Sequence, residues 1–358
     1  GTTTTGAADT PGFAAVQNDG LTTGAVEKDG SQTITFTGGG GLVVSGGPSG
    51  SRNSARVYAD GPQSISGGNI IHVLGGAGTG NAAEVVAEGD QTLAAGSIKV
   101  RGGSAGSDNA ALIQQLHGAQ SLTTTASLGV IVQGGTDGTG NSARVSSADG
   151  TTQTVSVSGG GLMVSGGSGA GTGNWALIEQ TGRAGMQSIS VVDGSLQLLG
   201  RSSSTRVLRG ASGSYAQISA QGTSQSVDVN RGIQVTGGTV GAGNFASLYA
   251  DTGTRQSISN ATDLTLMGGS SGGGVGVGNY ASLEAKSGAQ SILVGSLTVK
   301  GGADGTDNGA VIGAYNGASQ TLSATGLATV QAGAGGVGNY AALVADTQRL
   351  IMSGGLNI

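Results

Sequence analysis

Aromatic side chains recur at one position of a local pattern in the C-terminal half of this chain. Each follows an Asn, or a Ser in one case, and precedes an Ala: Trp175, Tyr215, Phe245, Tyr280 and Tyr340. Phe13 occupies the same slot near the start, ahead of Ala14. Rings on an outer surface bind sugars or neighbouring molecules, whereas rings stacked on one another stabilise a fold. Structural stacking is the favoured interpretation, and a polysaccharide or lateral filament contact is the alternative.

Three arginines, Arg201, Arg206 and Arg209, lie in the longest insertion of the chain, residues 201–214. A guanidinium pairs with carboxylate or phosphate through two parallel hydrogen bonds. Such a loop could clamp the acidic groups of a surface polymer. A solvated surface loop is the favoured interpretation of these residues.

Aspartates occur in some of the Gly-rich loops, at Asp108, Asp137, Asp304 and Asp307. They invite comparison with the glycine-aspartate loops that bind calcium in secreted solenoids. Other loops, such as GGAGTGNA, carry no acidic residue. No cofactor is therefore expected, and calcium remains an alternative.

Residues for catalysis are sparse. The chain has no Cys and two histidines, His72 and His117, which supports neither a Ser-His-Asp set nor a His-based metal site. Carboxylates scatter to turns rather than cluster as in polysaccharide-cleaving enzymes. The turn aspartates are Asp29, Asp60, Asp90, Asp149 and Asp346. We expect no enzymatic activity.

The elements that position these residues form a repeat. A tripeptide of Gln, then Ser or Thr, then an aliphatic residue returns every 28 to 38 residues, a period typical of stacked supersecondary units. Gln348 continues the series imperfectly. The repeated glutamines are Gln32, Gln63, Gln91, Gln120, Gln153, Gln187, Gln225, Gln256, Gln290 and Gln320.

Two further elements complete each repeat. One is Asn-x-Ala-x-aliphatic, in which Ser214 replaces the Asn once. The other is aliphatic-x-aliphatic-x-Gly-Gly, as at Leu42 and Val44 before Gly46. The repeated asparagines are Asn53, Asn81, Asn109, Asn141, Asn174, Asn244, Asn279, Asn308 and Asn339.

The three elements alternate between apolar and polar residues with period two, which is typical of half-buried strands, and no window has helical spacing. Three short strands and their corners, about 31 residues, wind once around a triangle. We predict an all-β, single parallel β-helix of about eleven coils over residues 1–358, uncapped at both ends. Asn and Gln share the parity of the buried residues, so their amides are expected to stack along the axis as structural ladders.

Composition excludes several partners. Charged residues make up 10% of the chain and its net charge is −5, without the basic stripe that neutralises phosphates, so no nucleic acid is expected. No apolar run reaches the length of a membrane-spanning helix. The absence of Cys is compatible with an outer-surface protein.

Iteration of these elements, as in GGTVGAGNFASLYADTGTRQSI, resembles the repeat shafts of filamentous-haemagglutinin-like exoproteins of Gram-negative bacteria, over essentially the whole chain. The resemblance implies a secreted, extracellular protein at the cell surface with a role in adhesion, biofilm or matrix building.

The two ends of the chain are in phase with the repeat. The segment Phe13, Ala14 and Val16 fits the strand that is due after Leu356 and Ile358. We therefore expect a stiff filament or shaft in which copies stack head to tail through these residues, a contact that generates an open polymer. A segment bounded by repeat boundaries within one longer exoprotein would have the same phase. The alternative function is a polysaccharide-binding module of a larger adhesin.

Overall fold

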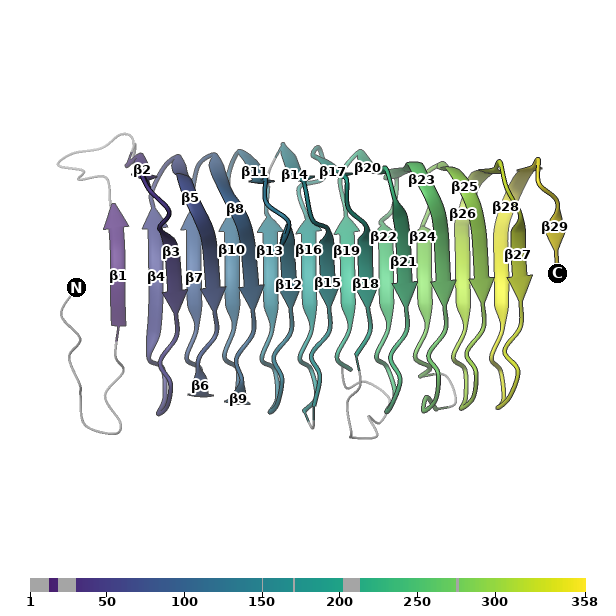
Figure 1. The fold of residues 1–358 in the computed structure, drawn as a ribbon, viewed down its shortest axis with the longest axis horizontal. Coiled ribbons are helices and arrows are strands. Elements are labelled where there is room, and N and C mark those ends of the chain that lie inside the picture. The colour runs from purple at the N-terminus through teal and green to yellow at the C-terminus, as the bar shows by residue number, and fades with distance from the viewer. Residues whose placement is uncertain (1–12, 19–29, 150, 170, 202–212, 275–276) are drawn as a thin grey trace.

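The computed structural model is an elongated stack of coils (Figure 1). It describes residues 13–18, 30–149, 151–169, 171–201, 213–274 and 277–358. Over these residues the chain forms strands and no helix, and successive coils pair in parallel. The predicted all-β parallel solenoid is confirmed. About ten turns separate the first coil from the last, which corresponds to a rod about 50 Å long.

Each coil contributes one strand segment to each of three faces. The first face is built from the Asn-x-Ala-x-aliphatic segments, whose alternating small and aliphatic residues favour a half-buried strand. Its strands, in order of pairing, are β1 (Phe13–Asn18), β4 (Ser54–Ala59), β7 (Ala83–Ala87), β10 (Ala111–Gln115), β13 (Ala143–Ser147), β16 (Ala176–Gln180), β19 (Ala216–Ala220), β22 (Ala246–Ala250), β24 (Ala281–Ala285) and the starts of β26 (Ala310–Ala324) and β28 (Ala341–Met352).

The second face begins at the repeated glutamines. It comprises β2 (Gln32–Thr35), the starts of β5 (Gln63–Leu74) and β8 (Gln91–Arg101), β11 (Ala119–Thr124), β14 (Thr152–Ser158), β17 (Met186–Val192), β20 (Ser224–Val229), the starts of β23 (Arg255–Met267) and β25 (Gln290–Lys300), and the later parts of β26 and β28.

The third face leads into the Gly-Gly corners. It comprises β3 (Gly41–Ser45), the ends of β5 and β8, β12 (Val130–Gln133), β15 (Leu162–Ser165), β18 (Leu196–Leu199), β21 (Gly232–Thr236), the ends of β23 and β25, β27 (Ala328–Gln331) and β29 (Leu356–Asn357). Two short loop strands, β6 (Ala77–Thr79) and β9 (Ala105–Ser107), pair separately.

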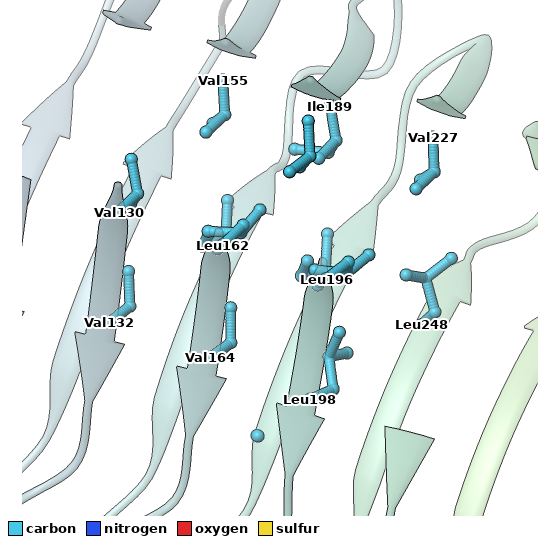
Figure 2. Packing of buried hydrophobic residues seen from close by; sticks show 14 of the residues in the cluster. Val130, Val132, Val155, Leu162, Val164, Ile189, Leu196, Leu198, Val227 and Leu248 are labelled. Atoms are coloured by element: carbon cyan, nitrogen blue, oxygen red, sulfur yellow. The ribbon is translucent and has the colours of Figure 1, made fainter. Parts of the chain in front are cut away.

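The interior is a narrow column of aliphatic side chains. Inward residues of the three faces line the axis, as Leu248, Val155 and Leu196 do in Figure 2, and each is fully buried. Identical small positions stack above one another, because the parallel register aligns Ala143, Ala176 and their counterparts. This regular packing removes the inward aliphatic side chains of the middle coils from water, which stabilises the stack.

Glycines allow the corners of successive coils to approach closely. Gly106 has a φ of 77°, and a Cβ there would lie 1.8 Å from the carbonyl oxygen of Gly78 in the preceding coil. Only glycine combines that backbone conformation with so close a contact. Among the described residues, no helix is long and apolar enough to cross a membrane.

Candidate functional site

The repeated glutamines form one hydrogen-bonded ladder inside the rod. Each Nε2 donates to the Oε1 of the glutamine one coil earlier, at N···O distances of 2.5 to 3.0 Å. The ladder runs without a break from Gln348 to Gln32, so Gln348 belongs to it despite its atypical sequence. Most of these amides are buried, where a satisfied network adds rigidity.

The asparagines form a second ladder with the opposite polarity. The backbone N–H of Asn53 donates to Oδ1 of Asn81 at 2.8 Å, and this contact repeats up to Asn174 and again from Asn244 to Asn339. The side-chain Nδ2 groups bind loop carbonyls, such as that of Ala105 at 2.7 Å from Asn109. At Ser214 the backbone N–H keeps its bond to Asn244, but the buried hydroxyl has no partner.

A row of hydroxyl groups covers the outer side of the second face. The residue after each glutamine from Gln32 to Gln320 is Ser or Thr, and the parallel register places these residues in one line. None of their hydroxyls makes a hydrogen bond within the described residues, so they face solvent. The Ser or Thr of the repeated tripeptide is the sequence signal for this row.

Four of the aromatic residues stack on the outer side of the first face. Ring centroids are 5.9 Å apart for Trp175 and Tyr215, 4.7 Å for Tyr215 and Phe245, and 4.9 Å for Phe245 and Tyr280, with interplanar angles of 9°, 3° and 2°. Stacked in this way, the inner rings cover one another's faces. The stack therefore stabilises the coils, and only its edges and ends are open to a ligand.

Tyr340 stands apart from the stack, because Gly309 occupies the slot in the coil between Tyr280 and Tyr340. A Cβ at Gly309 would lie 2.7 Å from both Cε1 and Cζ of Tyr340, so the Tyr340 ring bends back over the glycine. The ring remains 49% exposed. At the other end of the rod, Phe13 pairs in register with Ser54, so it lies in the slot of the row, five coils away from Trp175.

An open groove of about 680 Å³ follows the edges of this aromatic row. Tyr215, Phe245, Tyr280 and Tyr340 form one wall, and residues just before the asparagine corners, including Asp307, form the other. The groove therefore combines aromatic surface with a carboxylate at the coil of Gly309.

A second tyrosine and a carboxylate lie on the same outer face, around Gly313, four residues beyond Gly309. Tyr315 covers Gly313, because a Cβ there would lie 2.4 Å from Cζ and Oη of Tyr315. Gly313 pairs with Glu284. Burial raises the pKa of Glu284, opposed by a hydrogen bond with Ser282. Burial, together with the charge of Glu284, raises the pKa of Tyr315 to about 12. The sequence prediction did not include this cluster, whose visible signal is Gly313 between Glu284 and Val344 of the neighbouring coils.

The predicted arginine site is only partly described. Arg206 and Arg209 lie outside the described residues. Arg201 is half-buried, and its Nε donates to Oγ of Ser165 at 3.0 Å. The guanidinium of Arg201 thus binds the rod itself.

Charged side chains elsewhere on the first face pair with each other. Arg144 binds Glu179, which also accepts a hydrogen bond from Ser146 at 3.1 Å. Arg56 lies 3.4 Å from Glu84. The described residues contain no group of three or more His, Asp or Glu side chains placed to hold a metal ion.

The residues of the expected polymer junction lie at the two ends of the described rod. Phe13 is 60% exposed and Val16 is 56% exposed on β1, and Ala14 beside them is also exposed. At the far end Leu356 is 41% exposed and Ile358 is 90% exposed. These ends leave strand edges without a neighbour among the described residues.

No family model matches this chain, and no curated protein or solved structure matches it either.

Proposed function

We propose that the protein is a structural shaft or filament unit of a secreted protein, at the surface of a Gram-negative bacterium, that serves adhesion, biofilm or matrix building. The uninterrupted glutamine ladder carries this proposal, because a buried amide chain through every described coil gives a stiff rod. The resemblance of the repeat to filamentous-haemagglutinin-like shafts supports the same role. The uncharged hydroxyl row leaves one face suited to lateral contact.

The chemistry of the two ends supports head-to-tail stacking of copies. Gln348 has an Oε1 that accepts no hydrogen bond within the described residues, whereas the Nε2 of Gln32 donates to a backbone carbonyl, at 3.1 Å from the oxygen of Tyr58. A second copy placed on the last coil would supply Gln32 as donor to Gln348. The same register would set Phe13 beside Tyr340 and Val16 above Leu343. The partner in this proposal is the protein itself.

Electron microscopy of the purified chain at low concentration and neutral pH tests polymerisation. We expect long unbranched fibres, and short monodisperse rods about 50 Å long would contradict head-to-tail stacking. Val16→Asp places a charge in the proposed junction and should abolish fibres while circular dichroism stays unchanged. Ser188→Asp, on the outer side of β17, is the matched control that should still polymerise.

A second candidate function is a polysaccharide-binding module of a larger adhesin. The groove beside the aromatic row favours it, since aromatic surface with a few polar groups is typical of sugar sites. This function requires no polymer, so it can hold where the first one fails.

A further inference from the structure

Part of the third face carries apolar side chains on its outer side. Strand alternation buries Val130 and Val132 in the core and turns Ile131 outward, and Met163 lies beside Ile131 in the next coil. A groove of about 220 Å³ is lined by Ile131, Met163 and Leu128, and Leu128 is 65% exposed. A contiguous apolar patch on a protein surface marks contact with another molecule or with a membrane.

Two cations continue this apolar surface in the preceding coil. Lys99 pairs in register with Ile131, and Arg101 follows two residues later on the same outer side of β8. Both side chains are half-buried, and neither forms an ion pair with another described residue. Burial and the charge of Lys99 lower the pKa of His72, one coil earlier, so that imidazole is neutral at pH 7. Lys99, Arg101, Leu128, Ile131 and Met163 together form what we call the basic apolar patch.

No acidic residue offsets these charges on the strands of the same face. The third-face strands from β3 to β21 contain no Asp or Glu, and the first acid on these strands is Asp263 in β23. From there the face is polar, with Thr265 and Thr298 in the outer line that includes Ile131. Because the whole chain has a net charge of −5, the basic apolar patch differs from the rest of the surface in both charge and polarity.

We infer that the basic apolar patch binds the surface of an anionic lipid bilayer. Leu128, Ile131 and Met163 pack against the outer part of the acyl chains, and Lys99 and Arg101 lie at the level of the lipid phosphates. Apolar burial and the attraction of Lys and Arg to anionic lipids both strengthen such binding. A nucleic acid or an acidic protein would pair with the two cations but leave the apolar groove uncovered. The inference goes beyond the proposed function and does not depend on polymerisation.

Flotation of vesicles through a density gradient tests the inference, because unbound rods and fibres stay at the bottom of the gradient. One set of vesicles consists of phosphatidylcholine, and the other contains about 30% phosphatidylglycerol. We expect the purified chain to float with the anionic vesicles only, and added salt should weaken its binding. Equal binding to the two sets, or binding to neither, would overturn the inference and leave the proposed function untouched.

Single substitutions locate the binding surface. Lys99→Gln and Arg101→Gln should each lower the partition coefficient about fivefold, the effect of one charge near such a membrane, and Leu128→Ser should lower it as well. Arg255→Gln and Leu293→Ser are the matched controls, because they change an exposed cation and an exposed leucine on the second face. Both controls should bind like the original chain.

Melting curves by circular dichroism establish that each variant remains folded. Equal losses in the control variants would overturn the assignment of the membrane contact to the third face. A second copy of the chain is the other occupant that an apolar face invites. If Leu128→Ser removed side-by-side association of rods in electron micrographs and left vesicle binding unchanged, the lipid inference would be wrong.

Discussion

Burial changes the ionisation of one residue, Glu284. Its carboxyl group lies on the outer side of β24, half-buried beside Tyr315, and burial raises its pKa. In the unfolded chain a glutamate titrates near pH 4.3. The folded state therefore holds the proton more tightly than the unfolded state, and ionisation at neutral pH costs the fold stability.

Glu284→Gln should consequently raise the melting temperature at pH 7. The difference from the original chain should shrink as the pH falls toward about 4, because protonation then removes the penalty in the original chain as well. Melting curves by circular dichroism at several pH values measure this. Asp149→Asn changes an exposed carboxylate that is 3.9 Å from His117 and should alter stability little. A Glu284→Gln advantage that did not depend on pH would contradict the argument.

Removal of one glutamine from the ladder should lower the stability of the rod, because it breaks hydrogen bonds to both neighbouring glutamines. In Gln187→Ala, Gln225 loses the acceptor for its Nε2 and Gln153 loses the donor to its Oε1, and both groups are buried. We expect the free energy of unfolding to fall by about 2 kcal/mol. Urea unfolding measures it. Ser188 follows Gln187 in sequence but lies on the outer side of the strand, so Ser188→Ala should change the free energy of unfolding by less than about 0.5 kcal/mol. Equal effects of the two variants would argue against a structural ladder.

The sequence predicts the strands and the core but not every strand boundary. Period-two alternation around Val155 and Ile178 specifies which residues are buried, so the strands and core follow from the pattern. Sequence does not show where a strand runs on through a corner, as β26 does from Ala310 to Ala324. It also treats Tyr340 as one more member of a uniform row, because the bending of the ring over Gly309 depends on a contact between coils.

The rod is a stack of equivalent coils, so its length should change by one coil at a time when one coil is deleted. Asn141 and Asn174 occupy equivalent positions one coil apart. Deletion of residues 142–174 joins Asn141 to Trp175 and should give a folded rod shorter by about 4.8 Å. Small-angle X-ray scattering measures the length, and circular dichroism measures the folded state.

An alanine inserted after Ala176 is the opposing test at this scale. The insertion would turn the following buried residues of β16, Ile178 and Gln180, toward the outer side, because side chains alternate along a strand. We expect loss of cooperative melting. A variant with this insertion that melted like the original chain would show that register does not hold the coils together.

The direction of the strand pairing has a mechanical consequence. Hydrogen bonds between coils run along the rod, so a pull on the two chain ends loads them one after another from the end, and a terminal coil peels away progressively. A coil of 28 to 38 residues that detaches becomes a thread about 100 Å long, while the rod shortens by about 4.8 Å. Under tension the rod is therefore a reserve of length that peels out one coil after another.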